Sequence, residues 1–222
     1  MERHFDESLK QLKEKLLRMS SLVEKIISSS IKSLNERNAD LANQVIGSDD
    51  EINMLEIEID DLCLKLLALH QPQAGDLRFI TSTMKITNDL ERIGDLAVNV
   101  GQRTLDLIKV PPLKLKIDIP KMANAAQGML KDSLNAFVNK DARLAEAVCK
   151  RDDEVDSLNH EIIMGLLKCT PDNQATVERI VDLVLVAKNL ERIADHSTNI
   201  CEDVIYMVEG RVIKHHIKDN AV

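Results

Sequence analysis

Apolar residues recur along the chain at steps of three and four, the spacing that keeps one face of a helix buried. One such stripe covers residues 5–34, a second covers residues 41–66, and a third covers residues 75–110. Pro72 follows the second stripe, and Pro111 follows the third. Because proline stops a helix, the pattern predicts long helices separated by short connections.

The same order of stripes returns after Pro120, with predicted helices that end near residues 138, 169 and 209. The segment DDEIN at 49–53 aligns with DDEVD at 152–156, and LERIGD at 90–95 aligns with LERIAD at 190–195. This is an internal repeat. It predicts an all-α fold of six long helices, arranged as two tandem three-helix bundles that cover residues 1–112 and 113–222.

Composition narrows the class of protein further. Aromatic residues make up only 2% of the chain, which is typical of packed helices rather than sheets. The formal net charge of −8 argues against a nucleic-acid partner, because such proteins need a basic face. The four cysteines form no C-x-x-C pair, so we expect buried thiols in a reducing compartment. The N-terminus has no apolar signal core, and we therefore predict a cytoplasmic protein.

Two rows of oxygen-bearing side chains occur in each repeat. Residues four apart lie in line on a helix, and the positions that do so are Glu91, Asp95 and Asn99 with their counterparts Glu191, Asp195 and Asn199. Shorter rows in the preceding helices are formed by Asp49 and Asn53, and by Asp152 and Asp156. When the apolar stripe faces the core, the long rows point away from it. Within each repeat the two rows could converge from neighbouring helices.

A solvated helix surface is the ordinary explanation for a single row of this kind. Like charges four residues apart, however, cost a helix about 0.2–0.5 kcal/mol, and here the arrangement recurs on two helices of both repeats. Arg92 and Arg192 are placed to relieve part of that repulsion. We therefore predict cation sites at Asp49, Asn53, Glu91 and Asp95, and at Asp152, Asp156, Glu191 and Asp195. Oxygen ligands favour Mg²⁺, Ca²⁺, Mn²⁺ or iron, with zinc less indicated. Whether Asn99, Asn199, His160 or His196 join these sites is left open.

No nucleotide-binding loop and no nucleophile motif occurs in the sequence. Ferritin-like oxidases place a glutamate three residues before an inward histidine, and none of the six histidines has that neighbour. We therefore expect a binding protein rather than an enzyme. A carboxylate-bridged metalloprotein (a metal store or oxidase) and a purely structural helical adaptor are the alternatives.

The paired E-R-I-[GA]-D and D-D-E-[IV]-[ND] segments, set in a duplicated helical chain, resemble the PhoU family of phosphate-uptake regulators. The resemblance covers nearly the whole chain. It implies an accessory protein of high-affinity phosphate import that represses the phosphate-starvation response when phosphate is plentiful. It also implies two partners, a sensor histidine kinase and the ATPase subunit of the phosphate ABC transporter, which bring the protein to the membrane only indirectly.

The same resemblance implies multinuclear iron or zinc clusters on the bundle surface, carried by the residues of the predicted cation sites, and a homodimer. Two positions differ between the repeats. Asn53 stands where the second repeat has Asp156, and Asn88 stands where the second repeat has Lys188. We therefore expect the two sites to differ in metal affinity.

Overall fold

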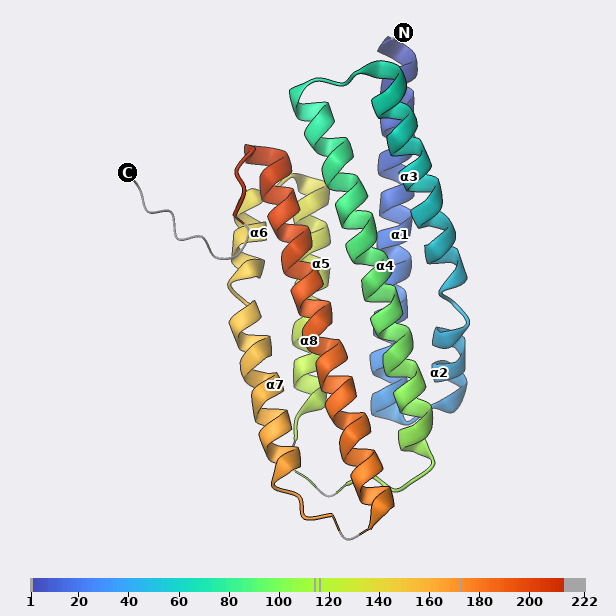
Figure 1. Ribbon diagram of the computed structural model, residues 1–222, viewed down its shortest axis with the longest axis vertical. Helices are drawn as coiled ribbons and strands as arrows, with labels where there is room; N and C mark the ends of the chain where they lie inside the picture. The colour runs from blue at the N-terminus through green and yellow to red at the C-terminus, as the bar shows by residue number, and fades with distance from the viewer. Residues whose placement is uncertain (1, 114, 116, 172, 214–222) are drawn as a thin grey trace, which may run out of the picture.

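The computed structural model describes residues 2–113, 115, 117–171 and 173–213. Within them the chain forms helices and no strands. In chain order the helices are α1 (Glu2–Glu36), α2 (Ala39–Ile46), α3 (Asp50–His70), α4 (Ala74–Ile108), α5 (Ile119–Asn139), α6 (Ala142–Cys149), α7 (Asp152–Leu167) and α8 (Gln174–Glu209). The predicted all-α fold with two similar halves is confirmed (Figure 1).

The second predicted helix of each repeat is interrupted in the structure, whereas the sequence predicts one continuous helix. It is divided into α2 and α3 in the first repeat and into α6 and α7 in the second. In the first repeat Gly47 ends α2, and its N–H donates to Asn43 O. The second repeat has no glycine at its break. Arg151 lies at this break, where its side chain pairs with Asp132 of α5 and packs over Gly128.

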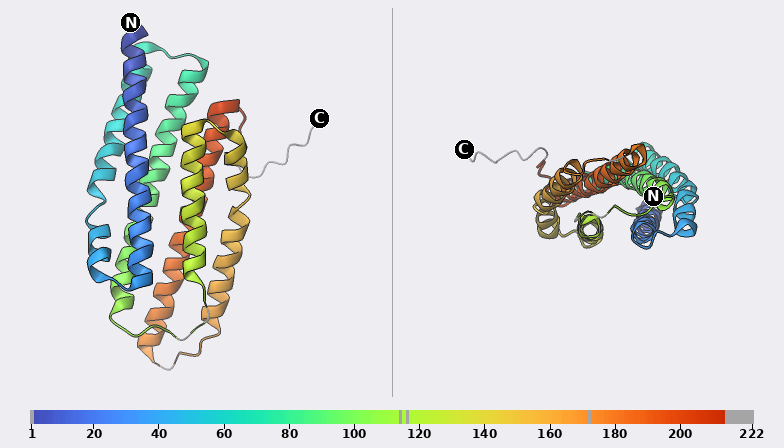
Figure 2. Two further views of the ribbon diagram at one scale, coloured as in Figure 1. Left: turned by 180° about the vertical axis from the view of Figure 1, so that it is seen from behind. Right: turned by 90° about the horizontal axis from the view of Figure 1, so that it is seen from below.

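The two halves meet along α4 and α8, which run antiparallel through the centre of the molecule (Figure 1). Lys85 Nζ lies 3.0 Å from Asp203 Oδ1 near one end of the contact, and Arg103 Nη1 lies 3.3 Å from Asp182 Oδ1 near the other. α1 and α5 lie on one face of this pair. The interrupted helices, α2 with α3 and α6 with α7, lie at the two outer edges (Figure 2). One apolar core extends through both halves.

The apolar stripes of the sequence are the buried faces of the helices. In α1 the side chains of Leu12, Leu16, Met19 and Val23 are fully buried, as the spacing predicts. Cys63 and Cys201 are buried free thiols, but Cys149 and Cys169 are only partly buried, which corrects the expectation for these two. No helix in the described ranges is both long and apolar enough to cross a membrane.

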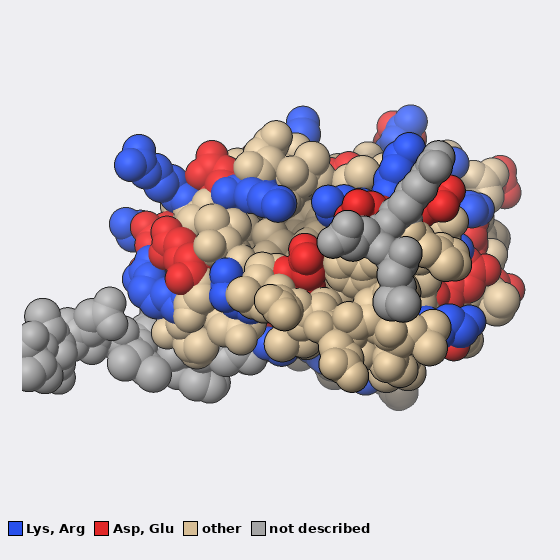
Figure 3. All heavy atoms as spheres, turned by 90° about the horizontal axis from the view of Figure 1, so that it is seen from above, with Lys and Arg blue, Asp and Glu red and all other residues tan. Residues whose placement is uncertain are grey.

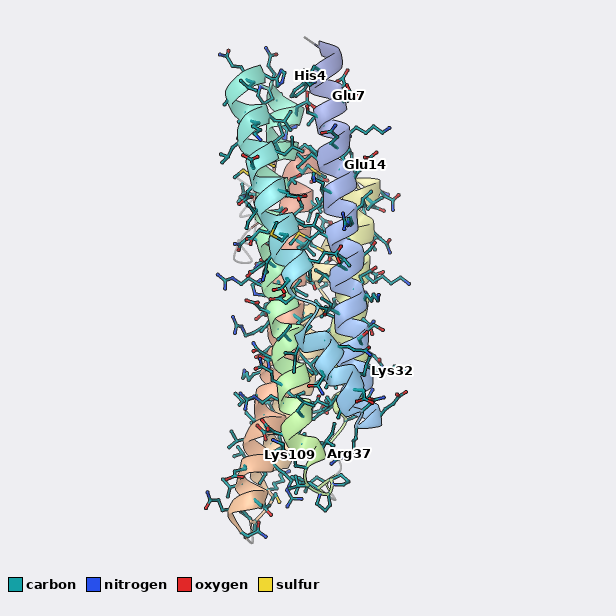
Figure 4. The ribbon with its side chains drawn as sticks, turned by 90° about the vertical axis from the view of Figure 1, so that its right-hand side faces the viewer. His4, Glu7, Glu14, Lys32, Arg37 and Lys109 are labelled. Carbon is teal, nitrogen blue, oxygen red and sulfur yellow. The ribbon has the colours of Figure 1, made fainter. Side chains whose placement is uncertain are left out.

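The segment between α4 and α5 crosses one end of the molecule and is held there by arginines. Arg37, just after α1, donates to Leu107 O at 2.6 Å, and Arg179 of α8 donates to Pro111 O at 2.7 Å. Arg37 and Lys109 lie at this same end in the side view of Figure 4. The predicted boundary after residue 112 falls inside this segment and stays a prediction.

Candidate metal centres

The first pair of oxygen rows lies where the start of α3 packs against the middle of α4. Leu90 and Ile93 of α4 are fully buried, whereas the side chains of Glu91 and Asp95 keep 18% and 42% of their surface exposed. The row therefore points away from the core, as the helical spacing predicts. Gly94 allows a close approach, because a Cβ at that position would lie 3.4 Å from Asp49 Oδ1.

Electrostatic coupling shows that these carboxylates are neighbours. Burial raises the pKa of Asp49, and the charge of Asp95 raises it further, while a hydrogen bond donated by Asn53 Nδ2 to Asp49 Oδ2 at 3.1 Å lowers it. Burial also raises the pKa of Glu91, with further increases from Asp95 and Asp49. Arg92 offsets part of this repulsion, with Nε 3.6 Å from Glu91 Oε2. The pairing expected for Arg92 is confirmed.

Two further carboxylates of α3 belong to this cluster and were not identified from the sequence. The pKa of Glu56 is raised by burial, then by the charges of Asp60 and Asp95. Burial alone raises the pKa of Asp60. With Asp49 and Asn53 they form one row at steps of four, three and four, a signal that was present in the sequence. Comparison of the repeats hid it, because Asn159 and Ile163 stand at the matching positions.

Among the described residues of the first repeat, four buried side-chain oxygens have no hydrogen-bond partner; Thr83 and Thr87 carry two of them, on hydroxyl groups, and the other two belong to the oxygen row. The two in the row are Asp49 Oδ1 and Asn53 Oδ1. Asp49 directly precedes α3 but makes no side-chain capping bond to it, so the ordinary role of an aspartate at this place does not account for it. Buried oxygens normally have a partner, and a bound cation supplies one. Even so, no three acidic, histidine or cysteine side chains in the described ranges are arranged closely enough to hold an ion.

The second pair of rows lies between the start of α7 and the middle of α8. Asp152 is partly buried, and Asp156 is exposed one turn further along α7. On α8, burial raises the pKa of Asp195, and the charges of Glu191 and Asp156 raise it further. Three of the four predicted residues of the second site, Asp156, Glu191 and Asp195, therefore lie close together. The seam between the facing rows of α3 and α4, and that between the rows of α7 and α8, are named the two carboxylate grooves. Arg192 is exposed, with no ion pair among the described residues.

Glu191 has hydrogen-bond donors, whereas its counterpart Glu91 has none within the part of the chain that the structure describes. Lys188 Nζ lies 2.6 Å from Glu191 Oε2 and 3.0 Å from Oε1. Asn159 Nδ2 donates to Glu191 Oε1 at 2.7 Å, which leaves Asn159 Oδ1 buried without a donor. The second groove therefore already contains a cation for one of its carboxylates.

The sequence left open whether four further residues join the cation sites, and the structure places them differently. His196 Nδ1 lies 2.8 Å from Asp89 Oδ1, and Asn199 Nδ2 donates to the same oxygen at 3.3 Å. Both contacts join α8 to α4, across the interface between the repeats. Asn99 and His160 are exposed. None of these four completes a cation site in the arrangement described.

Comparison with known proteins relates this architecture to a family. The family model described as "PhoU domain" matches residues 16–104 and again residues 119–204, once in each repeat, and both matches include the two oxygen rows. The chain belongs to the PhoU domain family.

Relatives in the PhoU family match almost the whole chain. A "Phosphate-specific transport system accessory protein PhoU homolog" from Aquifex aeolicus is 40% identical over 212 residues, covering 95% of this chain and 96% of the relative. A protein of the same description from Clostridium acetobutylicum is 37% identical over 218 residues, covering 94% and 96%.

Solved PhoU structures have the same fold. The crystal structure of PhoU from Pseudomonas aeruginosa is similar with a TM-score of 0.89 and 35% identity, covering 93% of this chain and 100% of that one. The regulatory protein PhoU from Streptococcus pneumoniae is similar with a TM-score of 0.85 and 29% identity, covering 94% and 98%.

Proposed function

We propose that this protein regulates phosphate uptake as a metal-binding accessory protein of a phosphate transport system. The relatives that it matches over nearly their full length are described as accessory proteins of the phosphate-specific transport system, which supports the transport part of this proposal. In this proposal it acts in the cytoplasm, binds partners without catalysing a reaction, and restrains the phosphate-starvation response by linking the ATPase of the phosphate ABC transporter to a sensor histidine kinase.

The observation that carries the metal part is the pair of partnerless buried oxygens at Asp49 and Asn53, set among carboxylates with raised pKa values. A bound cation would satisfy both oxygens and neutralise the repulsion between the rows of α3 and α4. Hard cations and iron match this oxygen donor set, and zinc matches it less well because no cysteine or histidine lies in either row. Small movements of flexible carboxylate side chains would complete the site.

Protein partners are supported by the outer surface of α3. Met54, Ile57 and Leu64 lie on one side of this helix, with 57%, 62% and 58% of their surfaces exposed. Apolar side chains grouped on an otherwise charged surface are typical of an interface. We propose this stripe as a contact for one of the partners or for a second copy of the chain. Binding through it would be insensitive to salt, whereas recruitment through the acidic surface would weaken as salt increases.

Deletion of the gene in its native host tests the regulatory role. Phosphate-responsive genes should then be expressed even in phosphate-rich medium, and the intact gene should restore repression. A variant with Glu91, Asp95, Glu191 and Asp195 changed to alanine should fold but restore repression poorly. If the deletion strain represses these genes normally and neither transporter nor kinase copurifies with the protein, the structural-adaptor alternative replaces this proposal.

A further inference from the structure

The two repeats do not end at the same level. At the end that carries the N-terminus, α1 and α4 project beyond the ends of α5, α6 and α8 (Figures 1 and 2). A cavity of about 290 Å³ lies in the resulting step, between α1 and α4 on one side and the α5–α6 turn and the end of α8 on the other. Figure 3 looks onto this end and shows a hollow where the two halves meet, with Lys and Arg side chains beside it.

Three cationic side chains from three separate elements line this cavity. They are Lys13 of α1, Arg78 of α4 and Lys140 of the α5–α6 turn, and Asp76 is the one acidic residue among the described residues of the lining. This balance is opposite to that of the whole chain, which has a net charge of −8. Contributions from both repeats mean that the site exists only when the halves are packed together.

These positive charges are not used by ion pairs within the fold. None of the three cations has a carboxylate partner among the described residues, although many other lysines and arginines of this chain do. Lys13 is instead held over the ring of Phe79, with Nζ 5.3 Å from its centroid. Arg78 Nε donates to Met207 O at 3.4 Å, and this contact leaves its two terminal amino groups available.

The remaining lining favours a small anion rather than a metal or a peptide. Phe79 and Met207 form a buried apolar floor, so charge is confined to the rim. The first turn of α4, at Gly75 and Asp76, also lines the cavity and adds the positive end of a helix dipole. Three cations against one carboxylate leave an excess of positive charge that a doubly charged anion would balance.

We propose that this cavity binds a small phosphate-class polyanion, either inorganic phosphate or a compact phosphate compound, with Lys13, Arg78 and Lys140 as its charged contacts. Arginine and lysine donate strong charge-assisted hydrogen bonds to phosphate oxygens. The site is separate from the carboxylate grooves, and it does not depend on the regulatory role or on metal binding.

Isothermal titration with inorganic phosphate and with pyrophosphate, at low ionic strength in chloride buffer, tests this proposal. The protein is first treated with a chelator, so that phosphate bound through a metal ion is excluded. Both anions should bind, pyrophosphate more tightly because of its greater charge, and the affinity should fall as salt is added. Tight binding of pyrophosphate with none of phosphate would identify a larger phosphate compound as the ligand and would support the site.

Lys13→Gln and Lys140→Gln should each weaken binding by about tenfold, because each removes a charge-assisted hydrogen bond while keeping most of the side chain. Lys10→Gln is the matched control, since Lys10 is exposed on the same helix and outside the cavity. The two test lysines are also exposed, so the variants should keep the helicity and melting temperature of the parent. If neither anion binds, or if Lys10→Gln weakens binding as much as the two test variants do, the proposal is overturned.

Discussion

The two carboxylate grooves share a motif but not an electrostatic environment. The first, between α3 and α4, contains five carboxylates with Arg92 as the nearby cation. The second, between α7 and α8, has asparagine and isoleucine at the positions of Glu56 and Asp60, and Lys188 already binds Glu191. Duplication has therefore kept the geometry of the rows while the residues around them have diverged.

This difference indicates that the repeated motif residues determine where the oxygen atoms lie, whereas the residues around them determine the net charge of each groove. A cation gains more in the first groove, because it replaces repulsion among carboxylates, than in the second, where it must compete with Lys188 for Glu191. We therefore expect the first groove to be the tighter cation site. In the metal-free protein it should also be the less stable region.

Disabling one groove at a time gives the largest expected effect. Glu91→Gln with Asp95→Asn should abolish the tighter class of binding, and Glu191→Gln with Asp195→Asn should abolish only the weaker class. The two classes should differ in affinity by on the order of tenfold or more. Calorimetric titration of chelator-treated protein with Mn²⁺ measures both. Equal affinities, or loss of both classes in either variant, would contradict the comparison.

Exchanging the neighbours between grooves gives a smaller and more specific effect. Lys188→Asn with Asn159→Glu should raise the affinity of the second groove by about tenfold, because a competing cation is lost and a carboxylate is gained. Asn88→Lys with Glu56→Asn should weaken the first groove by a similar factor. Lys188→Arg is the control, since it keeps the positive charge. The same Mn²⁺ titration applies, and an unchanged second site would show that other residues determine the difference.

The smallest effect is on the stability of the metal-free protein. The folded pKa of Glu56 is raised, chiefly by burial, so its contribution to stability is complete below the unfolded value of 4.5 and is lost as pH rises through the folded pKa. Glu56→Gln should therefore stabilise the protein at neutral pH by about 0.5 kcal/mol, a figure reduced for solvent screening, and should have little effect in acid. Urea unfolding at both pH values measures this.

Glu58, two residues further along α3, provides a control of opposite sign. A hydrogen bond from Lys15 lowers the pKa of Glu58, so its contribution to stability is present above the unfolded value and is lost as pH falls through the folded pKa. Glu58→Gln should destabilise the protein at neutral pH. If both variants change stability in the same direction, the electrostatic difference between these neighbours is not as described.

The fold could be predicted in large part because it follows from patterns among residues that are close together in the sequence. The apolar stripe of α1 and the repeated motifs specify buried faces and a duplication without any knowledge of distant contacts. The orientation of Glu91 and Asp95 also followed from the position of Leu90 and Ile93. Helical periodicity thus determines which side chains face the core and which face the grooves.

Features that depend on contacts between distant residues could not be predicted. The break before Asp152 arises where Arg151 meets Asp132, and no helix-breaking residue marks it. The contact of His196 with Asp89 joins the two repeats, so the position of His196 next to Asp195 in the sequence could not show which carboxylate it contacts. Glu56 and Asp60 were different, because their spacing was visible and only the comparison with the second repeat concealed it.

Elemental analysis after purification without chelator tests the central claim most directly. The native protein and a variant with Glu91, Asp95, Glu191 and Asp195 changed to alanine would be measured together, with circular dichroism as the check on folding. We predict bound metal in the native protein and none in the variant, with equal helicity, because the replaced side chains lie outside the core. Equal metal content in both proteins, or an absence of metal from the native protein even after incubation with iron, manganese or zinc, would contradict the account.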